Sequence, residues 1–300
     1  MGRGDSRSAS TGAYFSMPYL PLRPLPAAPH ASLADAWIER IADRLARPSG
    51  DVAADRALLC RETLLELSHP EYAANYDTAL VDESVPLGTR LALAALDPRN
   101  VTLEPEYYGE CDDARFQPVK PLLWLWYSFD RTALAGQNVG LGVRLRQLLA
   151  ERIFKRCGRN FKAFQHVEFS FGYNMDVGDD VVVHRHVLLD DRGGIRMGNG
   201  VSVSDYANIY SHTHSIVEQR DVTNALTVLE NGVRITYHAT VLAGVHVGEQ
   251  GMVGASAVAT KDVRPYHVYV GIPAKSVRVK PNAPEPKVVL GTSDRGVAER

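Results

Sequence analysis

The sequence has few cysteines and no long hydrophobic run. Its three cysteines, Cys60, Cys111 and Cys157, lie far apart and form no CxxC pair. This spacing indicates neither a disulfide framework nor a zinc knuckle, and it favours a reducing, cytoplasmic location. No apolar segment approaches the ~18–20 residues that a membrane-spanning helix needs, so we expect no membrane span.

An excess of charge of one sign is also lacking. The formal net charge is -2, which gives no general attraction to nucleic acid, so we expect no nucleic-acid partner. The hydrophobic share of 45% and the charged share of 23% are typical of a soluble globular protein. A chain of 300 residues is long enough for two domains.

The first part of the chain predicts an arm followed by a helical region. Residues 1–31 are rich in serine, alanine and proline, which indicates a disordered N-terminal arm. Residues 32–160 then predict helices, the first capped by Ser32 and ending before Pro48. Apolar residues at four-residue spacing form the stripe of this first helix, namely Leu33, Trp37, Ile41 and Leu45.

Three more helices are predicted in this region, over residues 53–67, 86–96 and 143–158, the last stopping at Gly158. The polar segment "EPEYYGECDD" (104–113) is typical of a turn. The apolar segment "PLLWLWYSF" (121–129) predicts core or an oligomer contact, with an interfacial membrane patch as a weaker alternative. No motif before residue 160 carries chemistry, so the role of the helical region stays open.

From about residue 165 the sequence follows a period of six. Apolar residues occur at every sixth position, interrupted by a slip of two residues and by one longer insertion. Four residues after most of these positions the side chain is again apolar or small. The periodic positions are Phe171, Val177, Val183, Leu189, Met197, Val203, Ile209, Leu229, Ile235, Val241, Val247, Val253 and Ala259. This period predicts a parallel β-helix, in which short strands and tight corners stack into coils around an apolar interior.

Several motifs resemble those of the hexapeptide-repeat acyltransferases, especially the maltose and galactoside O-acetyltransferase branch. "FGYNMDVGDDVVV", "LLDDRGGIRMGNGVSVSDYANIYSHTH", "VLAGVHVGEQGMVGASAVATKDV" and "VGIPAKSVR" resemble the opening, middle and closing motifs of that branch. The resemblance covers residues 161–279 and leaves 280–300 as a C-terminal tail. It implies a mainly β fold, a left-handed parallel β-helix preceded by the α-helical region.

The resemblance also implies a function. Family members transfer an acyl group from acetyl-CoA, a co-substrate, to a hydroxyl or amine and work as homotrimers with sites between neighbouring subunits. We therefore expect an acyl-CoA-dependent O-acyltransferase with a small hydroxyl acceptor such as a sugar, and no metal. "IYSHTHS" lies over the family motif that ends in the catalytic histidine, which implies His214 as the base. The residues expected to contact the cofactor are Ala243, Ser256, Thr260, Lys261, Lys275 and Arg278.

A histidine base suits this chemistry because an alcohol attacks a thioester only when its proton can be removed. The repeat holds no cysteine and no Gly-x-Ser-x-Gly elbow, which favours direct transfer over an acyl-enzyme. Glu218, Asp221 or a backbone carbonyl is expected to orient the imidazole. Arg185, His186 and the loop 215–228, with Glu218, are expected to form the acceptor pocket.

His212 is the second catalytic candidate. Thr213 is predicted to point inward, which would turn His212 and His214 outward together. Two other functions remain open at this point. The pairs "HRH" (184–186) and "HTH" (212–214) would allow a zinc enzyme like the γ-carbonic anhydrases, although no HxxxxH is present. The second open alternative is a non-catalytic β-helix that serves binding or assembly.

Overall fold

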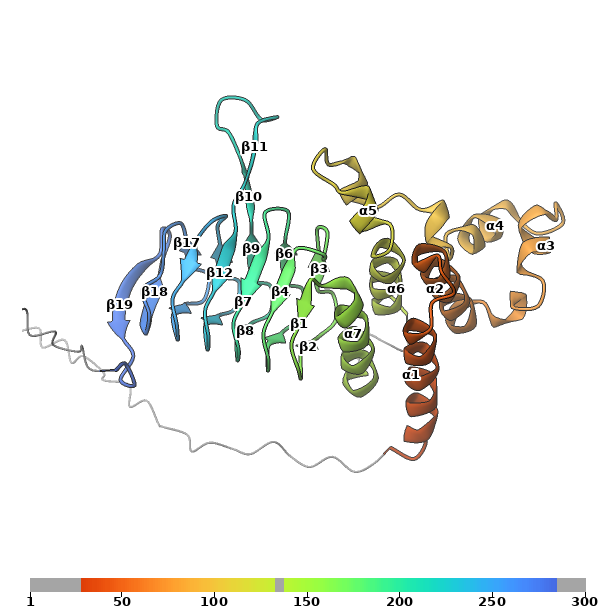
Figure 1. Cartoon of the computed structure of the whole chain (residues 1–300), viewed down its shortest axis with the longest axis horizontal. Coiled ribbons are helices and arrows are strands. Elements are labelled where there is room, and N and C mark those ends of the chain that lie inside the picture. The colour runs from red at the N-terminus through yellow and green to blue at the C-terminus, as the bar shows by residue number, and fades with distance from the viewer. Residues whose placement is uncertain (1–27, 133–137, 285–300) are drawn as a thin grey trace, which may run out of the picture.

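The structure is a computed structural model that describes residues 28–132 and 138–284. Most of the predicted N-terminal arm and most of the predicted C-terminal tail lie outside the described residues. A group of helices precedes a β-helix, and an antiparallel ribbon projects from the middle of the β-helix (Figure 1). No helix in the described part of the chain is long and apolar enough to cross a membrane.

The helical region contains longer helices and short 3-10 turns. The α-helices are α1 (Ala31–Ala46), α2 (Val52–Ser68), α3 (Tyr76–Val81), α4 (Leu87–Ala94), α5 (Asp113–Phe116), α6 (Lys120–Asp130) and α7 (Val139–Ile153). The 3-10 turns are η1 (Pro70–Tyr72), η2 (Pro98–Asn100) and η3 (Glu104–Tyr107).

Two predicted helix ends are wrong. Residue Ser32 lies inside α1, whose N-cap is His30 without a side-chain hydrogen bond, and Leu33 is 70% exposed and so lies off the buried stripe. Helix α7 ends at Ile153, well before Gly158, because the chain there enters the first β strand. The helices predicted over 53–67 and 86–96 are present as α2 and α4.

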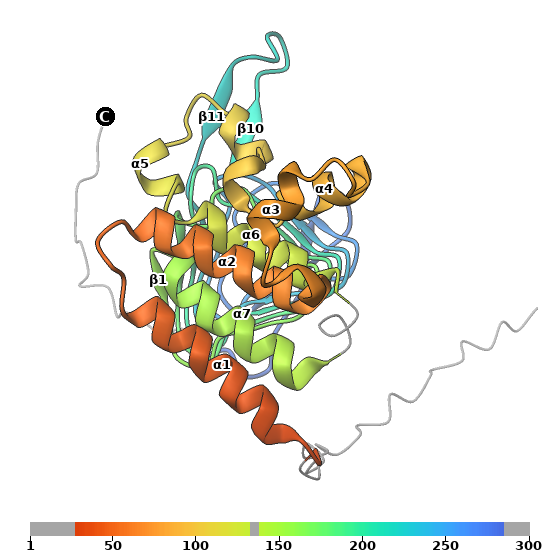
Figure 2. The same ribbon diagram turned by 90° about the vertical axis from the view of Figure 1, so that its right-hand side faces the viewer.

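Helix α6 is the apolar segment 121–129, and it is core. Trp126, Leu122 and Phe129 are fully buried. The Trp126 Nε1–H donates to the carbonyl oxygen of Val167 at 3.0 Å, so the helix is bonded to the first coil. Figure 2 shows the helices in front of the end of the β-helix. They cover its open N-terminal end, where apolar side chains and strand edges would otherwise face water.

The β-helix is built from short strands. They are β1 (Arg156–Cys157), β2 (Lys162–Ala163), β3 (Glu168–Phe169), β4 (Met175–Val177), β5 (Val182–Val183), β6 (Leu188–Asp190), β7 (Ile195–Met197), β8 (Ser202–Val203), β9 (Asn208–Tyr210), β12 (Thr227–Leu229), β13 (Arg234–Ile235), β14 (Thr240–Val241), β15 (His246–Val247), β16 (Met252–Val253), β17 (Val258–Ala259), β18 (His267–Val270) and β19 (Lys275–Val279).

These strands form three sheets, one for each face of a left-handed β-helix. The orders are β1-β4-β7-β12-β15, β2-β5-β8-β13-β16-β18-β19 and β3-β6-β9-β14-β17. All neighbours pair in parallel except β18 and β19. Phe169 lies beside Leu189, and Leu189 beside Ile209, so each face stacks like residues from successive coils. All of the periodic apolar positions are buried, which confirms the period.

The antiparallel ribbon consists of β10 (His212–His214) and β11 (Val222–Asn224). The prediction that Thr213 points inward is wrong, because its side chain is exposed. The chain leaves the coil after the buried Ser211, so β10 pairs with β11 and not with a neighbouring coil. Gly193 permits this exit: a Cβ there would lie 2.5 Å from the backbone nitrogen of Ala225.

Candidate active site

A cavity of about 1000 Å³ lies at the base of the ribbon. One wall is the segment 103–110 of the helical region, with α6 behind it. A second wall comes from strands β3, β6 and β9, and a third from residues 212–222 of the ribbon. The cavity therefore joins three parts of the chain that are distant in sequence, and both histidines of the "HTH" motif line it.

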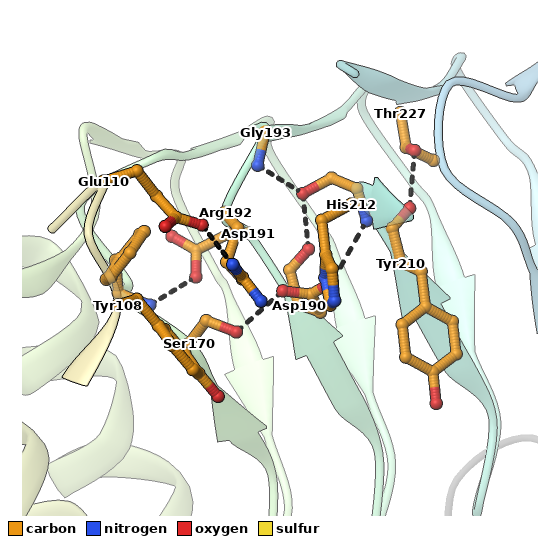
Figure 3. A network of polar contacts seen from close by, with 12 residues as sticks. Tyr108, Glu110, Ser170, Asp190, Asp191, Arg192, Gly193, Tyr210, His212 and Thr227 are labelled. Atoms are coloured by element: carbon orange, nitrogen blue, oxygen red, sulfur yellow. Dashed lines mark hydrogen bonds and ion pairs between the residues drawn. The ribbon is translucent and has the colours of Figure 1, made fainter. Parts of the chain in front are cut away.

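His212 is held by a buried carboxylate. Its Nδ1 pairs with Oδ2 of Asp190, and the side chains are 18% and 3% exposed. The other carboxylate oxygen accepts a hydrogen bond from the Ser170 hydroxyl at 2.7 Å, and the backbone N–H of Ser211 donates to Oδ2 at 3.4 Å. Figure 3 shows Asp190 between Ser170 and the imidazole of His212.

His214 is held differently. Its Nδ1 lies 2.7 Å from the backbone carbonyl oxygen of Gln219 in the ribbon. This carbonyl is one of the three partners considered for the base. The other two partners considered were acidic residues of the ribbon. The carboxylate of Glu218 accepts a hydrogen bond from the backbone N–H of Arg220 at 3.0 Å, and the backbone carbonyl of Asp221 accepts one from the backbone N–H of Ser215 at 3.0 Å.

Both imidazoles are thereby fixed in the same tautomer. A carboxylate and a carbonyl oxygen only accept hydrogen bonds, so Nδ1 carries the proton in His212 and in His214. In each neutral ring the lone pair then resides on Nε2. The ring centroids are 5.2 Å apart and the planes meet at 84°. Two imidazoles able to accept a proton therefore lie side by side on one cavity wall.

The helical region supplies the opposite wall. Nε of Arg192 donates to Glu110 at 2.6 Å, and its guanidinium lies 4.1 Å from the centre of the Tyr108 ring. Burial raises the pKa of Glu110, but backbone hydrogen bonding and Arg192 outweigh burial and hold this pKa below its usual value. Burial and the hydrogen bond to Glu104 raise the pKa of Tyr108 to about 12, so the phenol is protonated at neutral pH.

The carboxylate next in sequence, Asp191, has a structural position. It accepts hydrogen bonds from the backbone nitrogens of Phe171 at 2.7 Å and Asn174 at 3.0 Å. Complete burial raises its pKa to about 6, although these hydrogen bonds lower it. Its contacts hold the loop between β3 and β4, whose first residue, Ser170, lines the cavity.

Three residues expected to bind the acceptor do not line this cavity. Nε of Arg185 donates a hydrogen bond to the carboxylate of Asp205 at 3.0 Å. His186 stacks between the rings of His166 and Tyr206, with centroids 4.7 Å and 4.8 Å away. Glu218 lies in the ribbon but outside the lining.

The residues expected to contact the cofactor also lie outside the cavity, on coils beyond the ribbon. Ala243 follows β14, Ser256 precedes β17, Thr260 and Lys261 follow β17, and Lys275 and Arg278 are in β19. Lys261, Lys275 and Arg278 are all exposed. Strand β10, which carries both histidines, lies between the helical region and these last coils (Figure 1).

Sequence reasoning missed Asp190 and the whole helical wall. The acidic pair at 190–191 stands at the end of a buried strand, where a carboxylate can reach a neighbouring coil, and this was the available signal. Tyr108 and Glu110 gave no comparable signal, because "EPEYYGECDD" has the composition of a solvated turn. The segment is joined to the site by contacts with Arg192, which no local pattern encodes.

A metal centre finds no support in the described residues. Within 28–132 and 138–284 no group of three or more histidine, cysteine, aspartate or glutamate residues could hold a metal ion. His184 of the "HRH" motif stacks on Phe164 with a centroid distance of 5.1 Å. His212 is paired with the carboxylate of Asp190.

Comparison with known proteins agrees with this fold. No protein-family model matches the sequence. The galactoside O-acetyltransferase of Escherichia coli K12 is 24% identical over 140 residues, which are 45% of this chain and 69% of that protein. The maltose O-acetyltransferase of Clostridium difficile 630 superposes with a TM-score of 0.50 at 22% identity, covering 58% of this chain and 91% of that one.

A hexapeptide-repeat acetyltransferase of Vibrio cholerae, solved with acetyl-CoA, gives a TM-score of 0.48 at 22% identity and covers 56% of this chain and 87% of that one. The sequence match to an O-acetyltransferase and the three-sided coil with its periodic core lead to the same assignment. The chain is similar in sequence to the galactoside O-acetyltransferase and shares with the maltose O-acetyltransferase the left-handed β-helix fold of the hexapeptide-repeat acyltransferases.

Proposed function

We propose that this acetyltransferase moves an acetyl or other short acyl group from acyl-CoA to a hydroxyl group of a small polyhydroxylated acceptor, with His214 as general base. The observation that carries the proposal is the orientation of the imidazole. The carbonyl of Gln219 fixes the proton on Nδ1 and leaves Nε2 free at the cavity wall.

In the proposed transfer His214 takes up one proton and later returns it. Nε2 of His214 takes the proton of the acceptor hydroxyl while the oxygen attacks the thioester carbonyl carbon. The tetrahedral intermediate then collapses: the C–S bond breaks, the ester forms, and the thiolate of CoA takes the proton back from the imidazolium. Neither a covalent acyl-enzyme nor a metal ion is needed for this sequence.

We place the acceptor in the cavity. A volume of about 1000 Å³ is at the upper end of the range for small-molecule sites, so it can hold more than one sugar ring. Aromatic rings line it, including Tyr107, Trp124 and Tyr127, together with carboxylates and guanidinium groups. Apolar faces beside mixed charges suit a neutral polyol. The names of the relatives, galactoside and maltose O-acetyltransferase, agree with such an acceptor.

We place acyl-CoA along the later coils. Lys261, Lys275 and Arg278 are exposed cations there and can bind phosphate as point charges or, for the arginine, through two parallel hydrogen bonds. The thioester would then reach the histidines from the side opposite the cavity. A homotrimer would bring a neighbouring β-helix to these coils, as the family resemblance implies.

The test is a transfer assay with purified protein. Release of CoA thiol from acetyl-CoA is followed with maltose, β-galactosides, amino sugars and nucleotide sugars, and the product ester is identified by mass spectrometry. The proposal expects acceptor-dependent thiol release that the His214→Ala variant loses. Acetyl-CoA turnover that no acceptor stimulates, or a product acylated on nitrogen alone, would contradict it.

A further inference from the structure

We infer that Asp190 and His212 form an acceptor-positioning pair, in which Nε2 of His212 binds a second oxygen of the acceptor, next to the hydroxyl that is acylated. The inference rests on the proposed function and deepens it. It states that the preferred acceptor is a diol or polyol with neighbouring hydroxyls, not an isolated alcohol.

The first support is that Asp190 is built to hold an imidazole. The carboxylate is 3% exposed, and a buried charge is tolerated only when hydrogen bonds compensate its lost hydration. Ser170 and the backbone of Ser211 supply two of these bonds at 2.7 Å and 3.4 Å, and Nδ1 of His212 supplies the third. Ser170 and the backbone of Ser211 belong to the β-helix, so they fix the Asp190 carboxylate, and this carboxylate orients the ring of His212.

The second support is the difference between the two histidines. His212 is 18% exposed in its side chain and is anchored to the rigid coils, whereas His214 is exposed and anchored only to the ribbon. With centroids 5.2 Å apart, the two Nε2 atoms can each hydrogen bond a different oxygen of one small molecule. A rigidly held ring is suited to orienting a substrate, since misplacement of a reacting oxygen costs rate.

The third support is chemical. In its neutral form the fixed tautomer of His212 accepts a hydrogen bond at Nε2, and in its protonated form, beside the Asp190 carboxylate, it donates one. A hydroxyl group can serve either form because it both donates and accepts. Glu110 and Arg192 on the opposite wall neutralise each other, so this pair does not select an ionic group in place of the hydroxyl.

The experiment compares two replacements that separate the two ring nitrogens. In His212→Gln the side-chain amide extends to the place of Nε2, whereas in His212→Asn it reaches only the place of Nδ1 and keeps the contact with Asp190. With acetyl-CoA as donor and a methyl β-galactoside or maltose as probe acceptor, KM and kcat are measured for both substrates. We expect His212→Asn to raise the acceptor KM about tenfold or more and His212→Gln to raise it less, with the KM for acetyl-CoA unchanged in both.

Deoxy analogues of the same probe identify the bound oxygen. One deoxy analogue should show the lowest kcat/KM with the wild-type protein. For this analogue, His212→Ala should lower kcat/KM little further, because the deoxygenation and the substitution remove the same hydrogen bond. Asp190→Asn should raise the acceptor KM as His212→Asn does and leave the KM for acetyl-CoA unchanged, because the ring of His212 loses the carboxylate that orients it.

The outcomes separate the inference from the proposed function. A wild-type protein that transfers no acyl group to any hydroxyl overturns both. An active wild type in which His212→Asn equals the wild type overturns the inference alone, since Nδ1 and its bond to Asp190 would then suffice. Equal loss of kcat in both variants with unchanged acceptor KM also overturns it, because His212 would then act on the reacting proton.

Discussion

Glu110 and Arg192 form an ion pair between residues 82 positions apart in the chain, with Nε 2.6 Å from Oε1. Glu110 belongs to the segment that follows η3, and Arg192 lies just after β6, so the pair fastens the helical region to the β-helix. The Arg192 side chain is only 6% exposed, which means that removing its partner would leave a guanidinium charge nearly buried. The helical region is therefore part of the candidate site as well as a cap on the coils.

We expect Glu110→Gln to raise the KM for the acceptor by about tenfold, roughly 1.4 kcal/mol of acceptor binding. The amide cannot balance the charge of Arg192, so the wall that faces the histidines should shift. Steady-state kinetics with both substrates measures this, and the KM for acetyl-CoA should stay constant. Glu66→Gln is the matched control, because Glu66 pairs with Arg40 in the helical region outside the cavity. Equal effects of the two changes would contradict a role for this wall.

His214→Ala should lower kcat by roughly 10²–10⁴ with little change in acetyl-CoA binding, the range expected for loss of a general base. His212→Ala should cost less in kcat, about tenfold, through misplacement of the acceptor. His246→Ala is the control, since His246 is an exposed histidine of β15 that pairs with Glu230. If His212→Ala proved the more damaging change, the base would be His212.

Removing charge on the last coils should weaken acyl-CoA binding. In Lys261→Ala and Arg278→Ala we expect the KM for acetyl-CoA to rise more than kcat falls, because phosphate contacts far from the reacting carbon bind ground state and transition state alike. Calorimetric titration with CoA gives an independent measure of affinity. Unchanged affinity in the double variant would move the cofactor to another part of the surface.

The buried Asp191 should make stability depend on pH. Its pKa is about 6 in the folded protein against an ordinary value of 3.8, so the folded state binds the proton more tightly than the unfolded state. The stabilisation from this proton is complete below about pH 4 and is lost as pH rises through about 6, by on the order of 3 kcal/mol.

The comparison of wild type with Asp191→Asn isolates this effect from other titrating groups. Thermal unfolding is followed at pH 4 and pH 7.5. The variant cannot ionise, so its disadvantage relative to the wild type should shrink at the higher pH. A difference in Tm that is the same at both pH values would mean that Asp191 ionises in the folded protein as it does in the unfolded chain.

We expect the active protein to be a homotrimer. The family resemblance implies a site completed by a neighbouring subunit, and the later coils of this chain leave Lys261, Lys275 and Arg278 exposed where such a neighbour would lie. Light scattering or mass photometry at assay concentration measures the mass. A monomer with full transfer activity would show that one subunit contains the whole site.

The repeat was predictable from the sequence because its information is local. A period of six needs only that each short strand bury one large and one small side chain, and every periodic apolar position is indeed buried. Phe171 marks the limit of this prediction. It is buried, as the period requires, but the strand residue that pairs with Leu189 is Phe169, two positions earlier. A slip of two residues moves the strand without changing the apolar pattern.

The surroundings of the "HTH" motif were not predictable in this way. The position of Thr213 in its hexad predicted that it points inward. Strand β10 pairs instead with β11, and the hexad pattern does not encode a partner strand that follows an insertion. The pairing of His212 with Asp190 depends on stacking of successive coils, which brings the carboxyl end of β6 beside the end of β9.

The sequence by itself therefore determined the β-helix, the family it resembles and the two histidines, because periodicity and short motifs act between near neighbours. Only the tertiary structure decided which groups those histidines bind and which wall they face. Glu110, Asp190 and Gln219 reach the site through ion pairs and hydrogen bonds across coils, the helical region and the ribbon. Such contacts form only when the chain has folded, because their geometry comes from packing between segments that are distant in sequence.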